Sequence, residues 1–150
     1  MDTVRVLAPP IAIASPIMSP LFGNKDEKRA KEAAASAETD RLVGLSVADL
    51  AVEIMPAFGP NGLQTRAGHR QGPVEISTWL LSSFSSSVKY RQPVLGPVIE
   101  GLQALEHAGL VERRGFGNQG ASATYHATRL GVTALADGSV RQHLSTADGV

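Results

Sequence analysis

The hydrophobic pattern changes its period at Gly109, and this change restricts the fold more than any other feature of the chain. Before this glycine, apolar residues recur every three or four positions, as on one face of a helix: Leu95, Val98, Ile99, Leu102 and Leu105. After it, residues 110–114 and 122–127 have the composition of short strands and flank a glycine-rich stretch at 115–120. A helix that leads directly into a β-hairpin predicts an α+β fold that is mainly α.

Two helices are predicted upstream of this segment. The first begins at Ser46, where Asp49 follows at the spacing of a capping box, and it ends before Pro56. Its apolar positions recur at helical spacing: Val47, Leu50, Ala51 and Ile54. The second begins at Pro73, a favoured first residue of a helix, and runs through Phe84 into a serine-rich end. Together they would supply the surface on which a third helix packs.

The third helix is predicted from about residue 94 to residue 108, with Gly109 just after its end. Residues 88–93 are interpreted as a polar connection before it. A last helix is predicted from about Thr128 to Asp137, ended by Gly138. The stretch 57–72 is rich in glycine and has almost no periodicity, which predicts a long loop that carries basic side chains: Arg66, His69 and Arg70.

The N-terminal forty residues are predicted to lie outside the core. Residues 4–22 are mostly apolar but are interrupted by four prolines: Pro9, Pro10, Pro16 and Pro20. Each proline inside a helix costs about 3 kcal/mol, which argues against a membrane span and a signal peptide. We expect residues 1–24 to form an extended arm, either a loose tail or a segment that docks on a protein partner. Residues 25–41 lack an apolar stripe and predict an exposed helical linker, with a basic arm that tracks DNA as the alternative.

The charges and the missing cysteines exclude several functions. The 150 residues contain 14 Lys and Arg against 14 Asp and Glu, so no general basic excess attracts the chain to phosphate. Cysteine is absent, which excludes disulfide scaffolds and thiol nucleophiles. The histidines are scattered, and the G-x-G-x-x-G pattern at 115–120 leads into a strand instead of a helix. We therefore expect no enzyme activity, no metal and no cofactor.

The sequence on both sides of the predicted hairpin resembles a known family. Residues 98–113 read VIEGLQALEHAGLVER, similar to the L..L...GLV.R segment that joins the third helix to the wing in bacterial regulators. Tyr125-His126-Ala127-Thr128, followed by Gly131 and Leu135, resembles the Y.LT..G...L that closes the wing. Over about residues 94–138 the chain is thus similar to winged helix-turn-helix regulators of the MarR and PadR types.

This resemblance implies a winged helix-turn-helix domain over residues 42–144, with three helices, a two-stranded β wing and a C-terminal helix, followed by a frayed tail at 145–150. It implies a bacterial, cytoplasmic homodimer that binds DNA and regulates transcription. In such proteins the third helix enters the major groove and the wing contacts the backbone or the minor groove. The residues expected at DNA are Lys89, Tyr90, Arg91, Gln103, Arg113, Arg114, Asn118 and Gln119.

The third helix departs from this pattern at its polar positions. It offers Glu100, Gln103, Glu106 and His107 but neither Lys nor Arg, although base readout favours Arg, Lys, Asn and Gln. The two carboxylates repel phosphate unless they turn aside to pair with Arg91 or Arg113. The alternative function is therefore a winged helix used as a protein-interaction module, with the acidic third helix and the proline-rich arm as contact surfaces.

Overall fold

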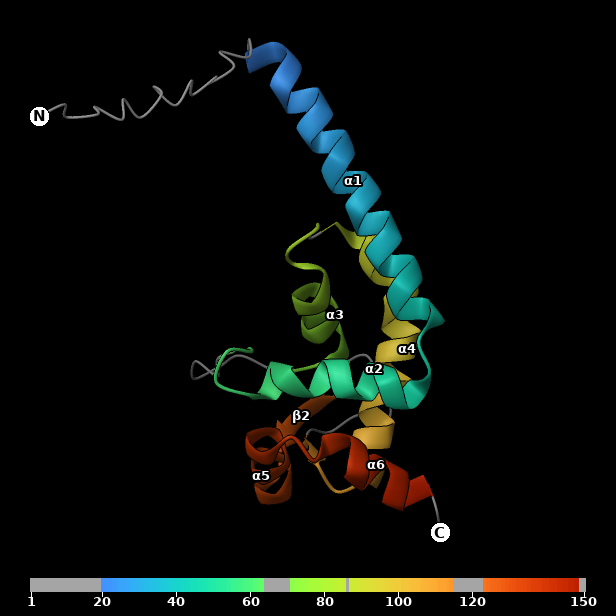
Figure 1. The fold of residues 1–150 in the computed structure, drawn as a ribbon, viewed down its shortest axis with the longest axis vertical. Coiled ribbons are helices and arrows are strands. Elements are labelled where there is room, and N and C mark those ends of the chain that lie inside the picture. Colours follow the sequence, from blue (N-terminus) through green and yellow to red (C-terminus); the bar gives the residue numbers. More distant parts are fainter. Residues whose placement is uncertain (1–19, 64–70, 86, 115–122, 149–150) are drawn as a thin grey trace, which may run out of the picture.

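The computed structural model describes residues 20–63, 71–85, 87–114 and 123–148, with side chains from residue 24 onward. These residues form a mainly helical fold with one small antiparallel sheet, as the sequence predicted (Figure 1). The elements are α1 (Pro20–Gly44), α2 (Val47–Ile54), the 3-10 helix η1 (Met55–Phe58), α3 (Pro73–Leu81), α4 (Val88–His107), β1 (Val111–Arg114), β2 (Thr124–Ala127), α5 (Arg129–Asp137) and α6 (Val140–Asp148). Of the arm predicted at 1–24, residues 1–19 lie outside the described residues, whereas residues 20–24 belong to α1 and are helical, not extended. Residues 64–70 of the predicted loop and residues 115–122, which include the predicted hairpin tip at 115–120, also lie outside the described residues.

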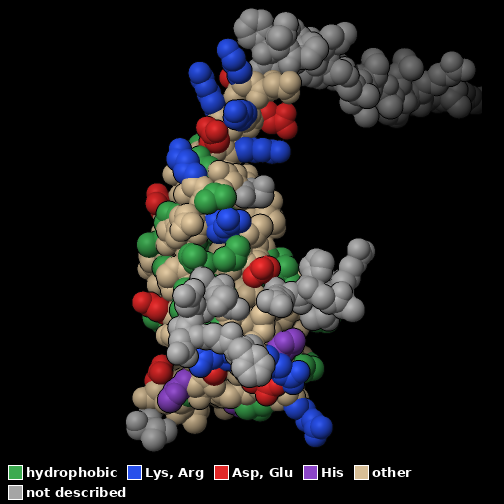
Figure 2. Space-filling model, turned by 180° about the vertical axis from the view of Figure 1, so that it is seen from behind, with side chains coloured by type: hydrophobic (Ala, Val, Ile, Leu, Met, Phe, Trp, Pro, Cys, Tyr) green, Lys and Arg blue, Asp and Glu red, His purple; other side chains and the backbone are tan. Residues whose placement is uncertain are grey.

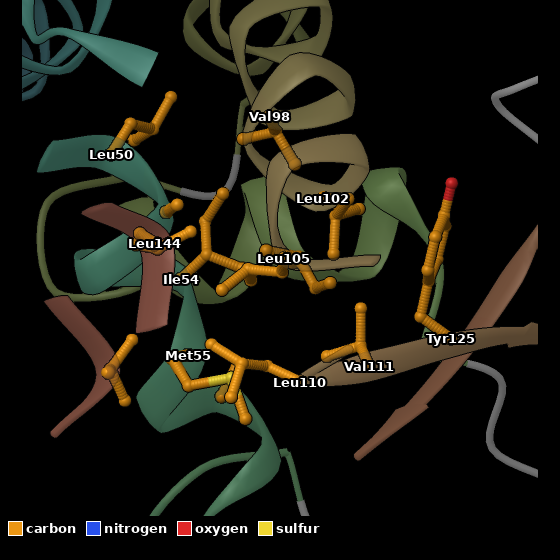
Figure 3. Packing of buried hydrophobic residues seen from close by; sticks show 14 of the residues in the cluster. Leu50, Ile54, Met55, Val98, Leu102, Leu105, Leu110, Val111, Tyr125 and Leu144 are labelled. Atoms are coloured by element: carbon orange, nitrogen blue, oxygen red, sulfur yellow. The ribbon is translucent and has the colours of Figure 1, made fainter. Parts of the chain in front are cut away.

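Helix α4 occupies the centre of the core, because α1, α2 and α3 all pack against it. Its buried stripe is Val94, Val98, Gly101, Leu102 and Leu105. Figure 3 shows Ile54 of α2 with Leu105 on one side and Leu144 of α6 on the other. Full burial of such a side chain stabilises the fold by about 1.5–3 kcal/mol relative to exposure. The apolar period read from the sequence therefore identifies the face of α4 that holds the fold together.

Capping side chains fix where two of the shorter helices begin. The Ser46 hydroxyl accepts a hydrogen bond from the Asp49 amide at 3.1 Å, which confirms the predicted start of α2. The Thr128 hydroxyl accepts from the Gly131 amide at 3.0 Å and donates to the Gly109 carbonyl at 2.6 Å. Because Gly109 has a φ of 75°, in the left-handed region, the chain turns sharply there, and the Thr128 hydroxyl attaches the start of α5 to this turn.

The sheet lies at the C-terminal end of α4. Its two strands are antiparallel, with Val111 opposite Ala127 and Arg113 opposite Tyr125. The Tyr125 amide also donates to the Gln71 carbonyl at 2.8 Å, which attaches the segment before α3 to β2. Tyr125 itself is only 2 % exposed and packs beside Val111 at the edge of the core (Figure 3).

Helix α1 is longer than the predicted linker, and the expectation that residues 25–41 contribute nothing to the core is wrong. Ala35, Thr39 and Leu42 are buried, and the Thr39 hydroxyl lies 3.3 Å from the Tyr90 carbonyl of α4. This stripe consists of one alanine, one threonine and one leucine, so no hydrophobic period is visible in the sequence. The half of α1 toward Pro20 extends past the rest of the fold (Figure 1).

Helix α4 begins at Val88, six residues before the predicted start, so Lys89, Tyr90 and Arg91 form its first turn and not a connection. Pro93 and Pro97 lie inside the helix. A proline removes only its own amide donor and already has a helical φ, although it also crowds the preceding turn. The packing of α1 against this end of α4 supplies the contacts that stabilise the helix despite these prolines.

The C-terminus also differs from the expected frayed tail, because residues 145–148 continue helix α6. Val140 and Leu144 of this helix are buried. Arg141 forms an ion pair with Asp49 of α2, with 2.7 Å between the guanidinium and carboxylate. Two buried apolar residues are too few to produce a periodic signal, which is why the sequence did not predict this helix.

Candidate nucleic-acid interface

The exposed face of α4 is the surface at which the sequence predicts contact with DNA. It consists of Val88, Lys89, Gln92, Pro93, Gly96, Glu100, Gln103 and His107. These positions follow one another at intervals of one to four residues and therefore form one stripe opposite the buried side. From Lys89 to Gln103 the stripe is about 21 Å long, at about 1.5 Å per helical residue. It carries one lysine, one glutamate and two amide side chains, so its charge is balanced.

At the first turn of α4, Lys89 is exposed and its ammonium lies 5.5 Å from the centroid of the Tyr90 ring. This distance suits a cation–π contact. Tyr90 is half-buried and packs against the core cluster. Of these two predicted DNA-binding residues, only Lys89 is exposed enough to contact a ligand freely, whereas Tyr90 mainly packs the first turn of α4 against the core.

Arg91 is turned away from the exposed stripe. Its guanidinium lies 3.3 Å from the Thr78 hydroxyl of α3 and is half-buried. A hydrogen bond in this geometry connects α3 to α4 next to the serine-rich turn between them. The structure therefore does not bring Arg91 together with Lys89 as a pair of phosphate ligands on one surface.

Strand β1 contributes two exposed arginines close to the C-terminal end of α4. Arg114 forms an ion pair with Glu112 at 2.5 Å, whereas Arg113 stands opposite Tyr125. Burial raises the pKa of the Tyr125 phenol and the nearby Glu106 raises it further, while Arg113 acts in the opposite direction. Asn118 and Gln119, the remaining predicted contacts, lie outside the described residues.

The two carboxylates of α4 do not turn aside into ion pairs. Among the residues that the structure describes, no basic side chain lies within 4.0 Å of Glu100 or Glu106. Glu100 is exposed on the stripe and Glu106 is half-buried. Among the described residues, neither carboxylate therefore forms the ion pair with Arg91 or Arg113 that would remove its repulsion toward phosphate.

Two residues that the sequence did not single out, Gln92 and Gly96, belong to this surface, and two lysines of the alternative basic arm, Lys28 and Lys31, lie next to it. Gln92 lies on the exposed stripe because α4 starts earlier than predicted, whereas Gly96 lies inside the predicted helix and was missed because it has no side chain. Lys28 and Lys31 of α1 line a groove together with Lys89. The spacing of three between the two α1 lysines is compatible with one helix face, but only the docking of α1 on α4 decides which face it is.

Comparison of the chain with protein-family models, curated proteins and solved structures finds no match. Within the described residues, no three His, Asp or Glu side chains gather as ligands for a metal ion. None of the helices in that part of the chain combines the length and the apolar character needed to span a membrane. The geometry of α4 and β1 therefore provides the argument for function.

Proposed function

We propose that α2, α3 and α4 form a winged helix-turn-helix with the β1–β2 sheet, and that the protein binds duplex DNA to regulate transcription. The order of the elements supports this architecture, as does the backbone bond from Tyr125 to Gln71 that attaches the chain before α3 to the sheet. The observation that carries the proposal is the exposed stripe of α4, which ends next to the arginines of β1.

The residues that would contact DNA fall into two groups in this proposal, those that bind phosphates and those that approach the bases. Lys89 and the two arginines of β1 bind phosphates, which position the protein without reading sequence. Gln92 and Gln103 present amides, the groups that pair bidentately with adenine in the major groove. Gly96 has open space around its α-carbon, so the helix backbone can approach a base edge closely. In a homodimer, as the resemblance implies, two such helices would bind half-sites about one helical turn apart.

The test is binding of random-sequence duplex DNA, measured by fluorescence anisotropy at two salt concentrations. With three phosphate contacts, affinity should fall about 40-fold between about 50 and about 200 mM salt. The double variant Arg113→Ala, Arg114→Ala should bind more weakly at low salt and lower the salt slope by about 2. Loss of the Arg114–Glu112 ion pair costs little, because exposed pairs contribute only about 0–1 kcal/mol.

The matched control is Lys25→Ala with Arg29→Ala, which removes the same charge from the exposed end of α1. This control should bind like the wild type. An unchanged affinity for the Arg113, Arg114 variant removes β1 from the interface. If the wild type shows no binding at low salt, the phosphate-based proposal is wrong.

A second function, a protein-interaction module, is supported by the carboxylates of α4. Glu100 and Glu106 have no basic partner among the described residues, so this face suits a basic protein surface as well as it suits DNA. Neutralising the two carboxylates distinguishes the functions, because it strengthens DNA binding and weakens binding to a basic partner.

A further inference from the structure

One face of α1 continues from the core into open space beyond it. Ala35, Thr39 and Leu42 are buried against the rest of the fold. The same face continues toward Pro20 at the same spacing of three or four residues, through Lys31, Lys28 and Asn24. Because the anchored half fixes the rotation of a continuous helix about its axis, it also fixes where Lys28 and Lys31 point.

They point into a groove of about 740 Å³ between α1 and the turn that joins α3 to α4. Lys89 at the first turn of α4 lines the same groove. Lys89 also belongs to the exposed stripe of α4, so the groove is continuous with the proposed DNA-binding surface.

The lining of the groove has the chemistry of a phosphate site. The three lysines face two carboxylates, Glu27 and Glu32, and none of the three forms an ion pair within 4.0 Å in the described part of the chain. Four serines of the α3–α4 turn add hydroxyl groups: Ser82, Ser83, Ser85 and Ser87. The positive end of the α4 dipole also lies here, because Ser87 and Lys89 at the start of α4 line the groove. No acidic residue in the first turn of α4 offsets it.

Apolar side chains contribute little to this lining, because only Phe84 and Tyr90 take part and both are half-buried. A groove that held a hydrophobic peptide segment would need larger apolar anchors. Ammonium and hydroxyl groups together are instead the side chains that contact the sugar–phosphate backbone of nucleic acids.

We propose that this groove holds one strand of the DNA backbone, so that α1 and α4 grip the duplex from two sides. The inference rests on the proposed function and adds a second phosphate-binding surface to it. Lys28 and Lys31 bind phosphates beyond the end of α4, and Lys89 is shared by both surfaces. The projecting half of α1 thereby contributes to DNA binding.

The test compares two double variants of full-length protein that remove equal charge from the same helix. Lys28→Ala with Lys31→Ala removes lysines that line the groove, whereas Lys25→Ala with Arg29→Ala removes charges that do not. The groove variant should bind duplex DNA about tenfold more weakly or worse at low salt, with a salt slope smaller by about 2. The control variant should bind like the wild type. Circular dichroism confirms that both variants are folded.

The possible results separate the groove proposal from the proposed function. If the Lys28, Lys31 variant and the Lys25, Arg29 control lose the same amount of affinity, the groove proposal is wrong, because the loss is then a general effect of charge. Weakening only in the Arg113, Arg114 variant overturns the groove and leaves the proposed function intact. Weakening in the groove variant but not in the β1 variant supports the groove and removes β1 from the interface. A wild type that does not bind DNA overturns both.

Discussion

Single glycines show how closely the helices of this protein approach one another. A methyl group on Gly131 of α5 would lie 2.0 Å from the Leu110 carbonyl oxygen, a backbone atom that has no freedom to move aside. At Gly101 of α4 the nearest atom is the terminal methyl of Ile54, at 2.7 Å, which belongs to a flexible side chain. At Gly96, on the exposed face of the same helix, nothing lies within 4 Å.

These surroundings predict opposite effects of the same substitution. Gly131→Ala should lower the free energy of unfolding by about 1–3 kcal/mol, because it overpacks the contact between α5 and the chain after α4. Gly96→Ala should raise it by about 0.5–1 kcal/mol, because alanine is the better helix former. Urea denaturation measures both changes. A Gly131→Ala protein as stable as the wild type would contradict the packing of α5 described above.

Helices α2 and α6 are joined at the surface by Asp49 and Arg141. The ion pair with Arg141 lowers the pKa of the Asp49 carboxyl, and the hydrogen bond with Ser46 lowers it further. A carboxyl whose pKa is lower in the folded state stabilises the fold above its unfolded pKa, about 4 for aspartate. This stabilisation is lost as the pH falls through the folded pKa.

Substitution of Arg141 by alanine should therefore return the pKa of Asp49 toward its ordinary range. The measurement is an NMR titration of the Asp49 carboxyl between about pH 7 and pH 2, across the ordinary aspartate pKa of about 4. Arg129→Ala, which removes an exposed arginine from α5, serves as the control and should leave that pKa unchanged. If the pKa of Asp49 is the same with and without Arg141, the ion pair does not form in solution and α6 is held only by Val140 and Leu144.

The neutral charge of the whole molecule hides an uneven distribution. Lys and Arg side chains gather along the projecting end of α1, mixed with acidic ones, as Figure 2 shows. The exposed stripe of α4 carries one lysine and one glutamate, Lys89 and Glu100, and its last turn adds Glu106. A molecule without a general basic excess binds phosphate only where its basic residues cluster. In this protein each such cluster, in the groove, on the α4 stripe and on β1, also contains a carboxylate.

Neutralising the carboxylates of α4 tests which surface faces DNA. Glu100→Gln with Glu106→Gln should increase the affinity for duplex DNA several-fold, because it removes like-charge repulsion without changing side-chain size. Asp26→Asn with Asp40→Asn makes the same change of charge on α1 and should have a smaller effect. Equal increases would indicate a general effect of net charge. No increase in either variant would favour the protein-interaction function over DNA binding.

Much of the fold was predictable because it depends on neighbours in the sequence. Ser46 at the start of α2 and Thr128 at the start of α5 act on amides three residues away. Gly109 supplies a left-handed turn where the pattern changes period. Each of these features needs only local backbone geometry, so local sequence was sufficient to locate them.

The candidate site was less predictable, because side chains on one element are directed by contacts with another. Lys89 and Gln103 were predicted and lie on one exposed stripe, but Arg91 bonds to α3 and Tyr90 packs against the core. The sequence suggested that Glu100 and Glu106 pair with Arg91 or Arg113, but no such ion pair forms among the described residues. Whether any of these residues binds DNA stays a prediction.

The sequence by itself determined the central helix, the strands that follow it and the caps of the helices around it, because hydrophobic period and capping are short-range properties. Only the tertiary structure decided that α1 docks on α4 through Ala35, Thr39 and Leu42, and therefore that Lys28 and Lys31 meet Lys89 across a groove. A stripe so weakly apolar is buried only because α4 presents a complementary surface, and no local pattern in the chain records that surface.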